Sequence, residues 1–191
     1  RDLGETNNAD DHMDRIYVGT VDTVVAYSFN GYKRYTLDLS GDVSTSVNVI
    51  NLGDTSSPAG ETHMIYVGCD DGSLNAFVDD VYERDGTSNE KPSYDETFVA
   101  MLDGPVSSDV AVMNVEFRPA GTNAIDFISR DRVFVGTEAG TVYCFDWNLD
   151  LVWSTNLGNS SVTSVAVTDK LGIIIAGTED GLIYGMRIAD G

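Results

Sequence analysis

The sequence predicts an all-β fold made of repeated sheets, and three recurring patterns support this prediction. An apolar run, a glycine, a short polar stretch and a second apolar run recur as a hairpin. An aromatic residue with a leucine four residues later recurs after the hairpins. A small hydroxyl residue followed by Val-x-Val recurs before them. One repeat therefore holds four short strands in about 40 residues, which is typical of a β-propeller blade.

The hairpin is clearest at 132–145, where β-branched and aromatic runs flank the sequence Gly-Thr-Glu-Ala-Gly. Its glycines, Gly136 and Gly140, suit turn positions that need a positive φ. Three more copies occupy the ranges 16–27, 65–77 and 174–186. The first copy lacks the second glycine and is one residue shorter. Each hairpin supplies the two middle strands of a repeat, which we call strands B and C.

The other two patterns supply an inner strand A and an outer strand D. Gly136 and Gly177, at the same position of neighbouring repeats, are 41 residues apart. We expect the valines of strand A to be buried near the propeller axis. They are Val47, Val49, Val110, Val112, Val165 and Val167. We expect the aromatics of strand D to pack between adjacent blades, and they are Tyr35, Phe98 and Trp153.

The repeats divide the chain into four blades of a single domain spanning 1–191. The predicted blade ranges are 1–39, 43–102, 106–157 and 162–191. Blade one begins at strand B and blade four stops after strand C. We therefore expect about four repeats of a larger propeller of seven or eight blades. The remaining strands would come from more of the polypeptide or from a neighbouring subunit that completes the propeller.

Long insertions occur only in A–B and C–D links, at 1–14, 51–63, 79–95 and 115–131. Because strands alternate in direction, these links emerge on one face, and the short B–C and D–A links emerge on the other. Loops on rigid scaffolds often carry function, so the long-loop face is the predicted partner face. Drift in unconstrained loops remains an alternative. The candidate contact residues are Tyr82, Arg84, Lys91, Tyr94 and Phe117.

The composition of the chain limits which classes of partner it can bind. The formal net charge is -20, which repels nucleic acid and anionic membranes, so neither is expected as a partner. No apolar run is long enough to span a membrane. Cys69 and Cys144 are isolated and suit packing positions. His12 and His63 lie in polar stretches, and we expect both to be exposed.

The hairpin and the tryptophan after it resemble the PQQ-like, or quinoprotein-type, propeller repeat family. The resemblance rests on the hydrophobic run, Gly-Thr-x-x-Gly and a small residue before tryptophan, as at 133–153. Asp146 and Trp153 match the family motif, but the segment between them is one residue short and has no glycine. The resemblance implies a propeller fold. It leaves the function open, because the same blade serves dehydrogenases, membrane-assembly scaffolds and surface proteins.

No catalytic constellation is visible, and a Ser-His-Asp set would have to use histidines from polar loops. We expect a non-enzymatic scaffold or adhesion module that mediates protein–protein interaction in an extracellular or periplasmic structure. One alternative is a fragment of a quinoprotein dehydrogenase, with quinone and calcium bound in a complete propeller. A second is a carbohydrate-binding propeller that uses exposed aromatics such as Tyr82 and Tyr94.

Cofactors and modifications are weakly indicated. We expect no cofactor, although Asp10, Asp11 and Asp14 leave calcium binding open. Asn159 begins an Asn-Ser-Ser sequon in a predicted D–A turn, which makes it a glycosylation candidate in a eukaryotic secretory protein.

Overall fold

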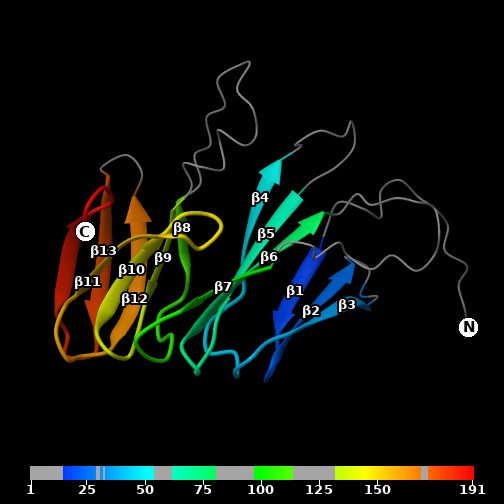
Figure 1. Cartoon of the computed structure of the whole chain (residues 1–191), viewed down its shortest axis with the longest axis horizontal. Helices are drawn as coiled ribbons and strands as arrows, with labels where there is room; N and C mark the ends of the chain where they lie inside the picture. Colours follow the sequence, from blue (N-terminus) through cyan, green and yellow to red (C-terminus); the bar gives the residue numbers. More distant parts are fainter. Residues whose placement is uncertain are drawn as a thin grey trace, which may run out of the picture.

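The computed structural model describes residues 15–28, 31, 33–53, 62–80, 97–113, 132–168 and 172–191. The regular secondary structure of these residues consists of β-strands alone. The strands form four sheets that follow one another along the chain. The sheets stand side by side in an open fan, with the first and last at opposite ends (Figure 1). The predicted all-β fold of antiparallel blades is therefore confirmed.

Every hydrogen-bonded strand pair is antiparallel, and each sheet keeps its strands in chain order. Blade one contains β1 (Arg15–Gly19), β2 (Thr23–Ser28) and β3 (Lys33–Asp38). Blade two contains β4 (Asn48–Gly53), β5 (Thr62–Gly68), β6 (Ser73–Asp80) and β7 (Thr97–Met101). Blade three contains β8 (Ala111–Met113), β9 (Arg132–Gly136), β10 (Thr141–Phe145) and β11 (Leu151–Asn156). Blade four contains β12 (Val162–Thr168), β13 (Ile173–Thr178) and β14 (Ile183–Arg187).

The hairpin turns between strands B and C have the positive φ predicted for the second glycine, whereas the first glycine, Gly136, does not adopt it. Gly72, Gly140 and Gly181 have φ angles of 85°, 82° and 85°, in the left-handed region that side chains rarely adopt. The turn between β1 and β2 lacks this glycine and is shorter. Its Thr20 amide bonds directly to the Thr23 carbonyl at 2.8 Å.

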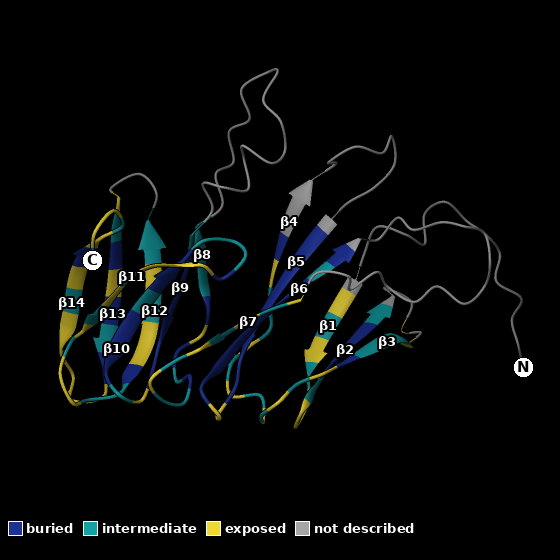
Figure 2. Cartoon of the chain, in the orientation of Figure 1, coloured by how far each residue is buried: buried dark blue, intermediate teal, exposed yellow. Residues whose placement is uncertain are grey.

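In the described part of the chain the core consists of three apolar clusters, each between two neighbouring blades. Successive residues of a strand point to opposite faces, so strand B serves two clusters at once. Tyr66 of β5 packs toward blade three, whereas its neighbours Ile65 and Val67 pack toward blade one. All three side chains are fully buried. Figure 2 shows this burial concentrated in the strands of the two middle blades.

The aromatic residues of strand D pack between blades, as predicted. Tyr35 joins the cluster between blades one and two, and Trp153 joins the cluster between blades three and four. The indole Nε1 of Trp153 donates a hydrogen bond to the Ile188 carbonyl at 2.8 Å. Phe98 meets Trp147 of blade three edge to face, with ring centroids 5.4 Å apart. These aromatics therefore connect each blade to the next.

The prediction for the strand A valines is largely wrong. Of the six, Val110 alone is buried, whereas Val49 is 40% exposed and the other four are half-buried. Strand A is the edge strand of its sheet, so a neighbouring blade covers its side chains only in part. Ile50, on the opposite face of β4, is buried against blade three instead.

Two predicted loop boundaries are also wrong. β4 continues through Gly53 and β5 begins at Thr62, so the predicted link 51–63 is shorter than expected at both ends. β6 continues through Asp80, which moves the start of the link 79–95. His63 and Asp79 therefore belong to strands and are buried, which corrects the prediction that His63 is exposed. The predicted insertions 1–14 and 115–131, and with them His12, lie outside the described residues.

A close contact between glycine and valine recurs at each blade interface. The glycine that ends strand B of one blade faces a valine in the link that enters the next blade. A Cβ atom added at Gly68 or Gly136 would overlap the Cγ1 atom of Val106 or Val162, respectively. At Gly19 the same atom would lie 3.0 Å from Val43 Cγ1. The recurring glycine of the hairpin is thus required by the neighbouring blade.

The linker valines also bond to the preceding blade through their backbone. The amides of Val106 and Val162 donate to the carbonyls of Cys69 and Thr137, each at 3.1 Å. Val43 donates to the Val21 carbonyl at 2.6 Å. Two residues after Val43 and Val106, hydroxyl side chains accept from glycine amides: Gly68 donates to Thr45 and Gly136 donates to Ser108. The hydroxyl pattern of the sequence therefore fixes strand A against strand B.

The glycine contact predicts a specific pattern of stabilities. Gly136→Ala should lower the free energy of unfolding by about 1–3 kcal/mol, because the new methyl group overpacks the blade interface. Adding Val162→Ala should recover part of this loss. Gly185→Ala is the matched control, because its Cβ would have no atom within 4 Å. Denaturant unfolding of the four proteins measures this, and an equal effect at Gly136 and Gly185 would contradict it.

Trp153 should contribute through both packing and its hydrogen bond. We expect Trp153→Ala to destabilise the chain by about 3 kcal/mol, in the range for a large aromatic in an apolar cluster. Trp153→Phe keeps a ring and loses the bond to Ile188, so it should cost about 1 kcal/mol. Thermal and denaturant melts distinguish the two. A Trp153→Ala protein that unfolds like the parent would show that the blade register is wrong.

Candidate interaction face

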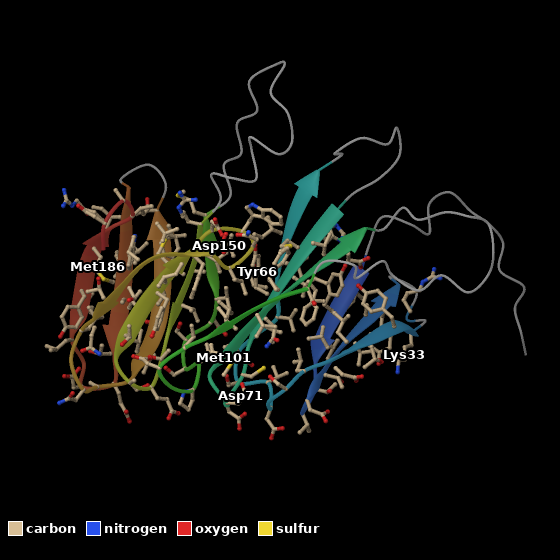
Figure 3. The ribbon with its side chains drawn as sticks, viewed as in Figure 1. Lys33, Tyr66, Asp71, Met101, Asp150 and Met186 are labelled. Carbon is tan, nitrogen blue, oxygen red and sulfur yellow. The ribbon has the colours of Figure 1, made fainter. Side chains whose placement is uncertain are left out.

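The two ends of the strands form two different sides of the fan. On one side, which we call the turn side, B–C turns bond to the links that join blades. The amides of Asp70, Glu138 and Glu179 donate to carbonyls of these links, each at 2.9 Å. We call the opposite side the loop side. Asp71 marks the turn side and Asp150 the loop side (Figure 3).

The longer links all join strand ends on the loop side. β4, β6 and β8 end there, and β5, β7 and β9 begin there, as the antiparallel register requires. The predicted contact residues lie outside the described residues, so their place on the partner face stays a prediction. They are Tyr82, Arg84, Lys91, Tyr94 and Phe117. Asp10, Asp11 and Asp14, the residues that left calcium open, lie outside them as well.

A buried polar cluster lies between blades one and two near the loop side. The Asp79 carboxylate, which is 2% exposed, accepts hydrogen bonds from the phenols of Tyr17, at 2.6 Å, and Tyr35. His63 Nδ1 lies 3.2 Å from the Tyr17 hydroxyl, and the two rings meet edge to face. His63 and Asp79 are direct cross-strand partners of β5 and β6. One carboxylate therefore joins two strands of the neighbouring blade.

The electrostatics of this cluster keep Tyr35 protonated. Burial, followed by the negative charge of Asp79, raises the pKa of the Tyr35 phenol above its ordinary value. The phenol therefore stays a hydrogen-bond donor throughout the physiological pH range. A buried carboxylate held by two such donors avoids the cost of an unpaired buried charge. The cluster thus acts as a polar clamp between blades one and two.

The C–D turn of blade three reaches over blade two on the same side. The Tyr66 hydroxyl of β5 donates to the Trp147 carbonyl at 2.8 Å. Leu149 has a φ of 65°, which is uncommon for a residue with a side chain, and its side chain is buried in the cluster between these blades. The Asp150 amide bonds back to Asp146 Oδ1 at 2.9 Å and closes the turn. The loop side of blades two and three is therefore held rigidly together.

On the turn side, aspartates accept bonds from neighbouring hydroxyl groups. Asp71 accepts from Ser73 and Ser40, and the Ser73 bond is the main cause of the lowered pKa of Asp71. Asp103 of one link accepts from Thr137 and Thr141 of the next blade, at 2.8 and 2.5 Å. These acids therefore serve turn and linker geometry, a role that aspartate commonly has in turns.

Other candidate groups are dispersed in the described part of the chain. No three His, Cys, Asp or Glu side chains gather there as a metal site. Cys69 and Cys144 are buried free thiols, and burial raises the pKa of Cys144 to about 12, which disfavours the reactive thiolate. Asn159 is exposed on the link between β11 and β12, on the turn side. Among the described residues, no helix that is long and apolar enough to cross a membrane is found.

Comparisons with known proteins support the fold. No protein-family model and no curated protein match the chain. Among solved structures, the computationally designed Ika4 protein aligns with a TM-score of 0.52 at 15% identity, covering 92% of this chain and 86% of that one. BBS1N in complex with ARL6DN aligns with a TM-score of 0.56 at 16% identity, covering 91% of this chain and 46% of that one. BamB from Moraxella catarrhalis aligns with a TM-score of 0.56 at 16% identity, covering 91% of this chain and 43% of that one.

These likenesses, at identities of 15–16%, concern the fold alone. Together with the consecutive antiparallel sheets they define the chain as a β-propeller protein. The chain spans less than half the length of the BBS1N and BamB chains that it matches.

The polar clamp predicts a stability loss at alkaline pH. A tyrosine with a raised folded-state pKa contributes stability that is fully present below about pH 10 and is lost as the pH rises through the folded value. Tyr35→Phe should therefore weaken the decline in unfolding free energy above about pH 10. Tyr184→Phe is the control, because it loses one phenol bond to the Leu157 carbonyl. Identical pH slopes in the parent and Tyr35→Phe proteins would contradict the clamp.

Proposed function

We propose that the chain is a non-enzymatic β-propeller scaffold that binds a protein partner through its loop side. The observation that carries the proposal is the difference between the two sides. The turn side consists of short turns whose backbone groups bond to interblade links. The long links instead leave from strand ends on the loop side, where the Asp79 clamp and the turn at 146–150 hold three blades together. Such a rigid base suits variable binding loops.

The comparisons support an interaction role in general terms. The BBS1N structure is a complex with ARL6DN, so a chain of similar fold takes part in a protein assembly. We extend this to the present chain as a proposal. The net charge of -20 favours a basic or cationic surface on the partner and disfavours nucleic acid.

We further propose that the protein acts in an extracellular or periplasmic structure, and its repeat fold, long loop insertions and net charge of -20 support this. In a eukaryotic secretory setting, Asn159 would be available for glycosylation on the turn side, away from the proposed partner. This placement would leave the loop side unobstructed.

Binding should depend on the loop side and not on the turns. Replacing residues 82–95 by a short turn keeps Asp79 and Asp80 in β6 and Thr97 in β7, so the fold should persist. Partner capture by this variant should fall at least about tenfold, because the loop supplies the proposed contacts. Substitution of the turn residues Glu179 and Asp180 with serine is the control and should leave capture unchanged.

The opposite result, with capture lost in the turn variant and kept in the loop variant, would show that the partner face is on the turn side.

Two alternative functions give distinct readouts with the parent chain. A quinoprotein would show a saturable absorption change with quinone and calcium, and a carbohydrate-binding propeller would bind a glycan array.

A further inference from the structure

The two outermost sheet faces of the fan carry exposed apolar side chains. On blade four, Ile175 of β13 is 46% exposed and Ile183 of β14 is 79% exposed. On blade one, Ile16 and Val18 of β1 are 50% and 43% exposed. These two faces lie at opposite ends of the fan (Figure 2).

The side chains equivalent to the exposed positions of blade four are buried in the other blades, except for Tyr17 of blade one, which is half-buried. Tyr66 and Phe134 occupy the position of Ile175, two residues before the glycine, and both are fully buried. The position of Ile183 is taken by three side chains that are also fully buried and that pack toward the following blade. They are Val24, Leu74 and Val142. The open face of blade four is thus the forward half of a blade interface.

The exposed positions of blade one follow the complementary rule. The side chains equivalent to Ile16 and Val18 are fully buried in blades two, three and four, and they pack toward the preceding blade. They are Ile65, Val133 and Ile174 for the first position, and Val67, Val135 and Ala176 for the second. The open face of blade one is thus the rear half of the same kind of interface.

Gly177 of blade four lacks the contact with a following blade that the equivalent glycines make. Its equivalents Gly19, Gly68 and Gly136 each contact the linker valine of the following blade. A Cβ at Gly177 would instead have only hydroxyl oxygens of its own blade within 4 Å, from Ser164 and Thr163. The forward face of blade four therefore has the small residue that a following blade requires.

We propose that a second copy of this chain covers these faces, with blade one of each copy packed on blade four of the other. This goes beyond the proposed function, because the second copy binds through the end faces of the fan and not through the loop side. The occupant is a second copy because blade one carries the rear-half positions that the forward half of blade four contacts in the internal interfaces. Two copies supply twice the four sheets of one chain, and eight blades is within the usual range of closed propellers.

Charge sets the conditions for this association. Each copy carries a net charge of -20, so two copies repel each other at long range. Salt screens this repulsion over a Debye length of about 8 Å at physiological ionic strength and about 3 Å at 1 M. The dimer should therefore strengthen as the salt concentration rises.

Sedimentation velocity of the purified chain alone tests the proposal without any loop-side partner, so a failed partner assay would not affect it. The parent should reach twice the mass of one chain at high salt. Ile183→Asp and Ile16→Asp should each weaken self-association by about 100-fold or more, because each would bury an unpaired carboxylate. Val99→Asp, at a 58% exposed position of β7 away from both faces, should associate like the parent.

Mixing the two variants gives the sharpest outcome. In a mixed pair, one interface carries both substitutions and the other carries neither, so the mixture should regain dimers that neither variant forms alone. Circular dichroism melts confirm that each variant is folded, as expected for substitutions at exposed positions.

Four results would overturn the proposal. They are a parent that stays monomeric at every salt concentration, a dimer that survives both substitutions, a mixture that remains monomeric, and a loss of dimers caused by Ile183→Asp but not by Ile16→Asp. The last result would indicate that two copies of blade four pair with each other.

Discussion

The contact between the hairpin glycine of one blade and the linker valine of the next is the constraint on which the structure depends. It occurs at Gly19, Gly68 and Gly136, each time with a valine whose amide also bonds to the preceding turn. At Gly68 and Gly136 a larger residue would overlap the valine and push the two blades apart, because interiors are packed without spare volume. The contact therefore fixes the distance between sheets at the turn side. The apolar clusters and the strand D aromatics then fill the space between them.

This constraint explains why the two sides of the fan differ. Links on the turn side are used to join blades, and their length is restricted by the hydrogen bonds that they make. The loop side lacks this repeated backbone pattern in the described residues and is instead held by individual clamps. These are the Asp79 carboxylate with its two phenols and the turn at Leu149 over blade two. Such clamps leave the length of the longer links free to vary, which is the physical basis of the proposed partner side.

The sequence predicted the strands and their order because glycine, hydroxyl and aromatic residues recur at fixed spacing. It could not predict burial at the edge strand, since Val47 and Val110 match in pattern but only Val110 is buried. It also missed the clamp at Asp79, whose four residues come from four strands of two blades. Periodicity identifies which face a residue occupies, whereas a polar cluster depends on contacts between distant segments. His63 was a usable signal, because it directly precedes the apolar run 64–67 and could have been assigned to the same strand.

Hydrogen exchange at the linker valines tests the central claim most directly. If the glycine–valine contacts hold the blades together, the amides of Val43, Val106 and Val162 are released only when two blades separate. They should then exchange as slowly as the amides in the middle of β5 and β9, with similar protection at the three interfaces. Exchange at the rate of exposed turn amides, while the strands stay protected, would show that the links open independently and would contradict the account.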